Sequence, residues 1–279
     1  MSVSSHITVI IPCYNDGAYI QQAVDSVVKQ TLKADKIILV DDGSKEETIQ
    51  VLHQLQVENL EIIYQTNQGV SIARNNAIKK ATTDFIVTLD ADDFMAPTFL
   101  EKTKQVLLSQ SEVGIVSSYR LNFNEATGKK EVIQPTGGKV TNFLLKNNGN
   151  SNAMFRKVCW EQVGGFDENM KAGYEDWEFW LAILKKNWTM EIVPEVLSHY
   201  RIKKTSRDKT ALTEHDVPLR QYIFKKHQDV FMENFDYYTS EMIRMNSLHR
   251  NTIFKYKNSL EYQLGKILLY PFRFLKKLN

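Results

Sequence analysis

A chain of 279 residues, 43% hydrophobic and 24% charged, is long enough for one large or two small globular domains. The net charge of +2 conceals a basic C-terminal end, because residues 250–279 hold seven Lys and Arg against one Glu and residues 1–249 therefore carry −4. Confinement of the positive charge to one end argues against a general nucleic-acid-binding face.

The two cysteines, Cys13 and Cys159, have no metal-type spacing with each other or with His, so we expect reduced structural thiols. The N-terminus is polar, and no uninterrupted apolar stretch is long enough to cross a bilayer. We therefore expect a cytoplasmic protein, peripheral on the cytoplasmic face of the inner membrane if it binds membrane at all.

The first half of the chain alternates strand and helix patterns. Apolar strands are predicted at residues 7–11, 36–40, 60–64 and 85–89, with helices near 19–30, 45–55 and 70–81 between them. Strands that are apolar throughout and separated by helices indicate βαβ units around a buried parallel sheet. Ligands bind such sheets at the carboxyl ends of the strands. Polar loops at residues 12–17, 41–44 and 90–93 follow three of these strands, so we expect them to converge on one crevice.

The pattern changes after about residue 120. We expect a turn-rich stretch at 125–138, a short strand and helix across 150–163, an amphipathic helix at 174–187, and strands at 189–192 and 196–201. From residue 210 onward the pattern is helical and polar. The predicted organisation is a domain of residues 1–209, with a nucleotide-binding half (1–118) and an acceptor-binding half (119–209), and a basic helical extension (210–279).

Three aspartates, Asp90, Asp92 and Asp93, crowd four positions directly after the predicted strand at 85–89. Carboxylates this close repel one another, and burying them unpaired is costly. A divalent cation would share their charge, and their hard oxygens suit Mg²⁺ or Mn²⁺. The alternative is an acidic loop that starts the next helix, because Asp also favours turns and first helical turns.

Several short motifs in a fixed order resemble the family 2 glycosyltransferases, which have the GT-A fold, over about residues 6–205. They are residues 9–15 (VIIPCYN), 40–44 (VDDGS), 67–69 (NQG), 73–75 (ARN), 89–93 (LDADD), 164–167 (GGFD) and 173–177 (GYEDW). The resemblance implies an α/β fold with a mostly parallel sheet flanked by helices, to which this chain adds the C-terminal helical extension. It also implies inverting transfer of a hexosyl or N-acetylhexosaminyl group from a nucleoside-diphosphate sugar to an acceptor hydroxyl.

Binding of the nucleotide sugar is the role that the resemblance implies for the first half of the chain. The residues carried over to this role are Pro12, Tyr14, Asn15, Asp42, Arg74, Asp90, Ala91 and Asp92. The ring of Tyr14 could form a wall for the base, or be a core tyrosine at a strand end. Asp42 could accept hydrogen bonds from base and ribose, or only shape a turn. Arg74 suits the phosphates or the carboxylate cluster, with an exposed helix arginine as the alternative.

The resemblance assigns the metal to Asp92 or Asp93 and the catalytic base to Asp176, with Glu175 supporting this base or contacting the acceptor. Acids in a first helical turn also complement the helix dipole without any catalytic role. Where many members of the family have a His that reaches the metal or diphosphate, this chain has Lys203. A protonated lysine is not a metal ligand, but it can contact phosphate. Metal coordination from this segment is therefore not expected.

The sequence indicates the substrates and partners less directly than the fold. The base-binding residues favour a UDP-sugar donor, and a glycan or lipid-linked acceptor in bacterial surface polysaccharide synthesis is expected by analogy. The alternative is a non-catalytic nucleotide-sugar-binding or scaffold protein with a relic site. Apolar residues at helical spacing among the basic residues of 250–279 suit an anionic membrane surface, or a helix packed on the catalytic domain or a second subunit. No nucleic-acid partner is expected, and the oligomeric state stays open.

Overall fold

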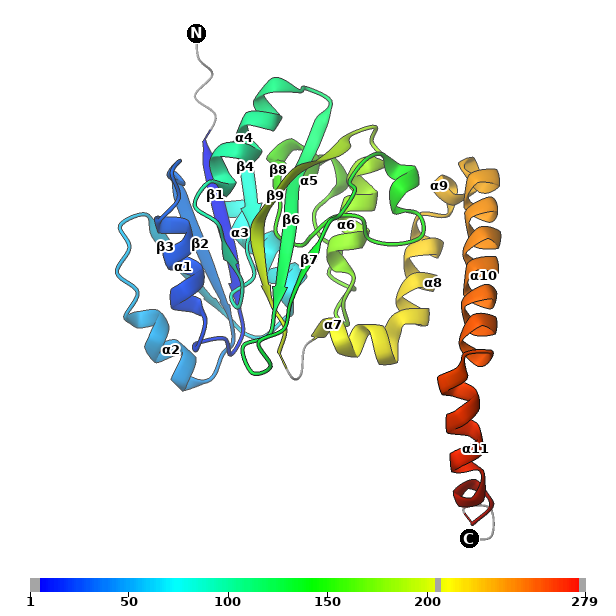
Figure 1. Cartoon of the computed structure of the whole chain (residues 1–279). Coiled ribbons are helices and arrows are strands. Elements are labelled where there is room, and N and C mark those ends of the chain that lie inside the picture. The colour runs from blue at the N-terminus through cyan, green and yellow to red at the C-terminus, as the bar shows by residue number, and fades with distance from the viewer. Residues whose placement is uncertain (1–5, 204–206, 276–279) are drawn as a thin grey trace. The chain divides into compact units, whose positions relative to one another are not determined.

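The computed structural model describes residues 6–203 and 207–275. Its centre is a nine-stranded sheet flanked by helices (Figure 1). The chain divides into two compact units, Met1–Val230 and Phe231–Asn279. Residues 210–230 thus belong to the first unit, and the predicted functional division of the chain at 209/210 stays a prediction.

The first half of the sheet is parallel. Strands run in the order β3-β2-β1-β4, and each adjacent pair is parallel. The strands are β1 (Ile7–Cys13), β2 (Lys36–Asp42), β3 (Leu60–Gln65) and β4 (Phe85–Thr88), and the connecting helices are α1 (Ile20–Val28), α2 (Glu46–His53) and α3 (Val70–Lys80). The apolar residues of β1, β2 and β4 are buried, as expected for strands covered on both faces.

Beyond β4 the sheet becomes mixed. The order continues β8-β6-β9-β5 with β7 on β6, and every pair in this half except β6–β9 is antiparallel. These strands are β5 (Phe94–Met95), β6 (Val113–Phe123), β7 (Lys130–Ile133), β8 (Met154–Arg156) and β9 (Thr189–Arg201). The predicted α/β fold, with a sheet flanked by helices and a C-terminal helical region, is confirmed.

The prediction of two separate strands at 189–192 and 196–201 was wrong, because β9 is continuous. A register shift against β6 between Val193 and Val196 accommodates Pro194, which has no N–H for the ladder.

Further helices follow β4 along the chain. They are α4 (Phe99–Ser109), α5 (Lys157–Val163), α6 (Glu175–Leu184), α7 (Arg207–Thr210), α8 (Asp216–Lys226) and α9 (Gln228–Glu233). α5 ends at Gly164, whose φ of +80° is a left-handed conformation that suits glycine. α6 buries Trp177, Phe179 and Trp180, so its first turn is held firmly in the first unit.

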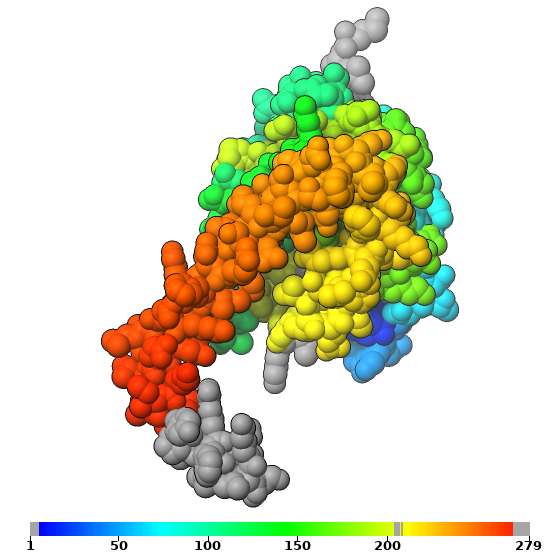
Figure 2. All heavy atoms as spheres, turned by 90° about the vertical axis from the view of Figure 1, so that its right-hand side faces the viewer, coloured from blue at the N-terminus to red at the C-terminus, as the bar shows by residue number. Residues whose placement is uncertain are grey.

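The second unit consists mainly of α10 (Phe235–Lys257) and α11 (Leu260–Leu275), which form one narrow rod in Figures 1 and 2. No residue of α10 is buried. Among the described residues, no helix has the length and apolar character needed to span a bilayer. Lys276 and Lys277, part of the basic end, lie outside the described residues.

Candidate functional site

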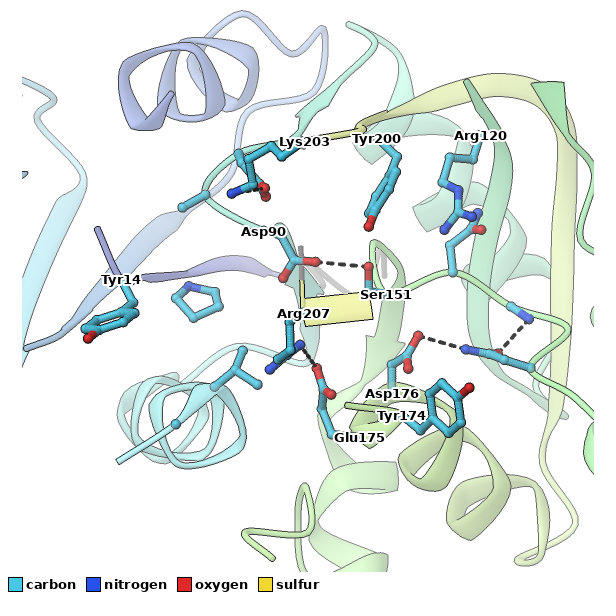
Figure 3. A pocket seen from close by; sticks show the side chains of 18 of the residues that line it. Tyr14, Asp90, Arg120, Ser151, Tyr174, Glu175, Asp176, Tyr200, Lys203 and Arg207 are labelled. Atoms are coloured by element: carbon cyan, nitrogen blue, oxygen red, sulfur yellow. Dashed lines mark hydrogen bonds and ion pairs between the residues drawn. The ribbon is translucent and has the colours of Figure 1, made fainter. Parts of the chain in front are cut away.

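A cavity of about 740 Å³ lies where β1, β2 and β4 end, facing the 133–151 segment and the start of α6. The three polar loops that follow these strands all contribute to its lining, so the predicted convergence is confirmed. In the view of Figure 3, Tyr14 lies on one side and Asp176 with Arg120 on the other, with Asp90 between them. This volume is within the range of small-molecule and cofactor sites.

On the side of the first half, Pro12, Tyr14 and Asp42 line the cavity. Tyr14 is 51% exposed, so its ring face is available to a ligand. Asp42 is buried, and it accepts hydrogen bonds from the backbone N–H groups of Gln68 and Gly69, both at 2.8 Å. Asp42 therefore fixes the loop that leads into α3 in addition to facing the cavity.

Asn15 does not line this cavity, in contrast to the prediction that it binds the nucleotide sugar. Its Oδ1 accepts from the backbone N–H of Lys45 at 2.8 Å, and its own N–H donates to Ser44 Oγ at 2.9 Å. Asn15 therefore connects the loop after β1 to the start of α2, and its side-chain oxygen is occupied by that contact. Ala91, by contrast, does line the cavity.

The acidic triplet is divided between the cavity and the interior. Asp90 and Asp92 line the cavity, whereas Asp93 does not. Asp93 is 1% exposed, and its two oxygens accept from Asn152 Nδ2 at 2.9 Å and from the N–H of Arg201 at 3.0 Å. Burial, with Asp90 and Asp92 nearby, raises the pKa of Asp93 well above its usual value. The geometry therefore disfavours Asp93 as a metal ligand, because its carboxylate is turned into the protein.

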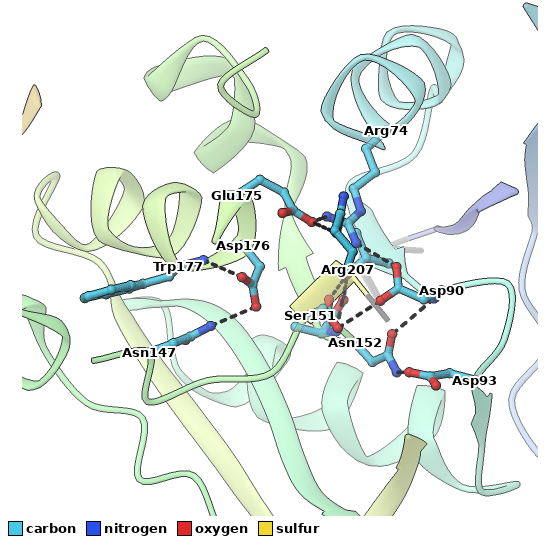
Figure 4. A network of polar contacts seen from close by, with 12 residues as sticks. Arg74, Asp90, Asp93, Asn147, Ser151, Asn152, Glu175, Asp176, Trp177 and Arg207 are labelled. Atoms are coloured by element: carbon cyan, nitrogen blue, oxygen red, sulfur yellow. Dashed lines mark hydrogen bonds and ion pairs between the residues drawn. The ribbon is translucent and has the colours of Figure 1, made fainter. Parts of the chain in front are cut away.

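Arg74 is also buried, with 1% of its side chain exposed, and does not line the cavity. Its guanidinium donates to Asp90 Oδ1 at 2.6 Å and to Glu175 Oε1 at 2.9 Å (Figure 4). Of the two roles expected for Arg74, the geometry favours the carboxylate cluster over direct contact with phosphates. Arg74 thereby joins the loop after β4 to the start of α6, which connects the two halves.

Glu175 is held by two arginines. Besides Arg74, Arg207 of α7 contacts Glu175 Oε1 at 2.5 Å. Burial alone would raise the pKa of Glu175, but Arg207 and Arg74 outweigh it and hold this pKa below its usual value. Asp90 behaves in the same way, since Arg74 and Arg207 outweigh the effect of its burial and lower its pKa. Glu175 is therefore a charged structural partner at the cavity wall.

Asp176, the next residue, lines the cavity and is partly exposed. Its Oδ2 accepts from Asn147 Nδ2 at 2.8 Å, and its Oδ1 accepts from the N–H of Trp177 at 2.8 Å (Figure 4). The burial of Trp177 in α6 and the contact to Asn147 orient the carboxylate. A charged carboxylate held in this way at the cavity wall can accept a proton from a bound hydroxyl.

Lys203 follows β9 and lines the cavity, as Figure 3 shows. Its Nζ contacts Asp92 Oδ2 at 2.6 Å and Asp16 Oδ1 at 2.9 Å. His199 stacks on Phe94 with ring centroids 4.3 Å apart and does not line the cavity. The basic group nearest the acidic triplet from this segment is thus a lysine.

The cavity also contains three basic side chains that the sequence did not indicate. Arg120, Lys146 and Lys171 line the cavity, and among the described residues none of them has a carboxylate partner. The guanidinium of Arg120 lies 4.8 Å from the ring centroid of Tyr200, and its buried Nε has no hydrogen-bond partner. These residues have no local motif, so only the fold could bring them together.

Comparisons with solved structures agree with this fold. Structures of S. aureus TarS 1–349 in complex with UDP-GlcNAc and with UDP align with TM-scores of 0.62 and 0.59, at 19% and 20% identity. The alignments cover 74% and 71% of this chain and 61% of each TarS chain. The chain thus spans about three fifths of those structures, and the likeness at this identity concerns the fold.

Sequence relatives agree as well. A protein named for teichuronic acid biosynthesis, the glycosyltransferase TuaG of Bacillus subtilis, is 29% identical over 72% of this chain and 80% of its own length. The O-antigen biosynthesis glycosyltransferase WbnJ of Escherichia coli is 27% identical over 85% of this chain and 97% of its own length. Fold, cavity and relatives define a glycosyltransferase of the GT-A type. The sequence model of the family described as "Glycosyl transferase family 2" matches residues 8–161, so the chain belongs to that family.

Proposed function

We propose that this glycosyltransferase moves a sugar from a UDP-sugar to a hydroxyl group of a glycan or lipid-linked acceptor, with inversion at the anomeric carbon. The observation that carries the proposal is the cavity itself. It unites Tyr14, Asp42 and Asp92 from the first half with Asp176 from the second. A donor bound by the first half would thus meet a carboxylate from the other half.

Asp176 is proposed as the general base. The acceptor oxygen attacks the anomeric carbon and gives its proton to Asp176, while the bond from that carbon to the diphosphate oxygen breaks and its electron pair leaves with the nucleoside diphosphate. Glu175 is less suited to this role because Arg74 and Arg207 already hold its carboxylate. We propose that Glu175 positions Asp176 and stabilises the first turn of α6.

The donor is proposed to lie against Tyr14, with its base over the ring and near Asp42. The exposed ring of Tyr14 supports this placement. The preference for uridine is supported by the TarS structures, which are similar in fold and were determined in complex with UDP and UDP-GlcNAc. Asp90, which Ser151 and Arg74 orient, is proposed to bind the ribose or the donor sugar.

A divalent cation, Mg²⁺ or Mn²⁺, is proposed to bind through Asp92. In the described part of the chain no three His, Cys, Asp or Glu are grouped to hold a metal ion by themselves. Asp92 nevertheless offers a hard oxygen to the cavity, and such ions commonly take their other ligands from phosphates and water. Bound there, the cation would stabilise the charge on the leaving diphosphate.

The acceptor is proposed to carry negative charge. Arg120, Lys146 and Lys171 give their part of the cavity three cations without carboxylate partners among the described residues. The positive electrostatic potential of these side chains would increase the affinity for an anionic acceptor, most strongly at low ionic strength. Similarity to TuaG and WbnJ supports a role in bacterial surface polysaccharide synthesis.

The C-terminal helices are proposed to contact an anionic membrane surface, which would place the enzyme at the cytoplasmic face of the inner membrane. Ile267 and Leu268 of α11 are 69% and 70% exposed, and Lys266 precedes them. Exposed apolar side chains next to basic ones suit the interface of an anionic bilayer.

Release of nucleoside diphosphate from a panel of UDP-, GDP- and dTDP-sugars tests the proposed function, with native protein compared with Asp176→Asn. Turnover of a UDP-sugar that this substitution abolishes is the expected result. Binding of the donor without turnover in either protein would instead support a non-catalytic scaffold with a relic site.

A further inference from the structure

Lys203 is bound in a way that bears directly on metal binding. Its ammonium bridges Asp92 Oδ2 and Asp16 Oδ1, at 2.6 and 2.9 Å, and all three residues line the cavity. The three side chains come from separate segments, after β9, β4 and β1. Both contacts are ion pairs, so the ammonium of Lys203 supplies a positive charge that the two carboxylates share.

Asp92 is the carboxylate of the acidic triplet that is best placed for a metal. Asp93 is buried with both oxygens occupied, and Asp90 is held by Arg74 and Ser151. The Asp92 oxygen that Lys203 contacts at 2.6 Å is in direct contact with a positive charge. A divalent cation at the same oxygen would meet strong repulsion from the ammonium, so the two cations compete for Asp92.

A diphosphate changes this competition. The ammonium of lysine has three donors, and Asp16 and Asp92 account for two of them. Lysine binds phosphate as a point charge, and a phosphate oxygen can replace Asp92 as its partner. Asp92 is then released for the divalent cation, which also neutralises the added negative charge.

We propose that Lys203 makes divalent-metal binding at Asp92 depend on the donor's diphosphate, by acting as the counter-ion of Asp92 until a phosphate group takes its place. This inference rests on the proposed nucleotide-sugar donor. Metal and nucleotide are then linked reciprocally, because each raises the affinity for the other by the same factor. The free enzyme would hold little metal, and its acidic cluster would stay neutralised without one.

Mn²⁺ titrations followed by the electron paramagnetic resonance signal of free Mn²⁺ test this, with and without UDP and corrected for the Mn²⁺ that UDP binds in solution. Wild type is expected to bind Mn²⁺ alone weakly and to gain affinity at least about 10-fold with UDP. Lys203→Gln is expected to bind Mn²⁺ alone about 10-fold more tightly than wild type and to lose most of the UDP-dependent gain. Lys203→Arg keeps the charge and should bind Mn²⁺ alone weakly, as wild type does. Lys79→Gln, at an exposed lysine outside the cavity, should bind Mn²⁺ as wild type does.

Equal Mn²⁺ affinities of wild type and Lys203→Gln without nucleotide, with normal folding by circular dichroism, would overturn the role of Lys203. Binding of UDP would still support the proposed donor in that case. Failure of UDP to bind wild type at any Mn²⁺ concentration would overturn the donor and the proposed coupling together. Tighter binding of Mn²⁺ by Lys203→Gln would then show only that lysine and metal compete.

Discussion

Arg74 is the most informative residue to replace, because its buried guanidinium joins the loop after β4 to the start of α6. We expect Arg74→Met to destabilise the first unit by about 3 kcal/mol. Removing one partner of a buried ion pair costs about 3–5 kcal/mol. The lower end of this range applies because both carboxylates retain other partners. Glu175 still pairs with Arg207 at 2.5 Å. Asp90 still accepts a hydrogen bond from Ser151 at 3.0 Å, and its side chain is 24% exposed to water.

Urea unfolding followed by tryptophan fluorescence measures this loss in the first unit alone. All four tryptophans lie in that unit, at Trp160, Trp177, Trp180 and Trp188. The signal therefore does not mix the unfolding of α10 and α11 with that of the catalytic fold. A loss below about 1 kcal/mol would refute the view that Arg74 is the buried partner of two charged carboxylates.

The pH dependence of the same loss separates charge from packing. The pKa values of Asp90 and Glu175 are lowered in the folded protein. The stability that these groups contribute is therefore present at neutral pH and disappears as the pH falls through their folded-state pKa values. The difference between wild type and Arg74→Met should shrink on acidification in that range. A difference that persists unchanged would indicate lost packing against Phe166, which lies beneath the guanidinium.

Two further substitutions test the donor site and the C-terminal helices. Tyr14→Ala should weaken UDP binding, measured by calorimetry, about 5- to 150-fold, since stacking of a base contributes about 1–3 kcal/mol. Tyr64 is about as exposed as Tyr14 but lies outside the cavity, so Tyr64→Ala should leave the Kd for UDP unchanged. Equal losses in both variants would contradict the proposed base wall. Replacing Ile267 and Leu268 by Glu in the full chain should reduce co-sedimentation with anionic vesicles, because it removes apolar surface and adds negative charge. Undiminished co-sedimentation would argue against a membrane contact there.

The fold was largely predictable because its first half is built from local patterns. Each strand from β1 to β4 is a short apolar run, and α1 and α2 each have an apolar face. The mixed pairing beyond β4 was not predictable, since the antiparallel neighbours of β8 depend on contacts with β4 and β6 that no local pattern encodes. The continuity of β9 was missed for a related reason, because Pro194 normally ends a strand unless a bulge accommodates it.

The candidate site was predictable where a residue follows a strand end or belongs to a family motif, as with Tyr14, Asp92 and Asp176. Partners of these residues were not predictable. Arg74 and Glu175 are 101 positions apart, and nothing in either segment indicates that they pair. The two residues whose placement differs most from the predicted roles, Asn15 and Asp93, have their carbonyl or carboxylate oxygens occupied by backbone N–H groups or a neighbouring amide.

The most direct test of the account is the turnover of a UDP-sugar by Asp176→Asn. Asparagine keeps the shape of the side chain and one of its two acceptor oxygens, so the substitution removes the capacity to take a proton together with one hydrogen bond, from Asn147 or from Trp177. The account predicts a fall in kcat of about 10²- to 10⁴-fold with an unchanged Kd for UDP, and no effect for Glu161→Gln, an exposed carboxylate outside the cavity. An Asp176→Asn enzyme with the kcat of wild type would contradict it.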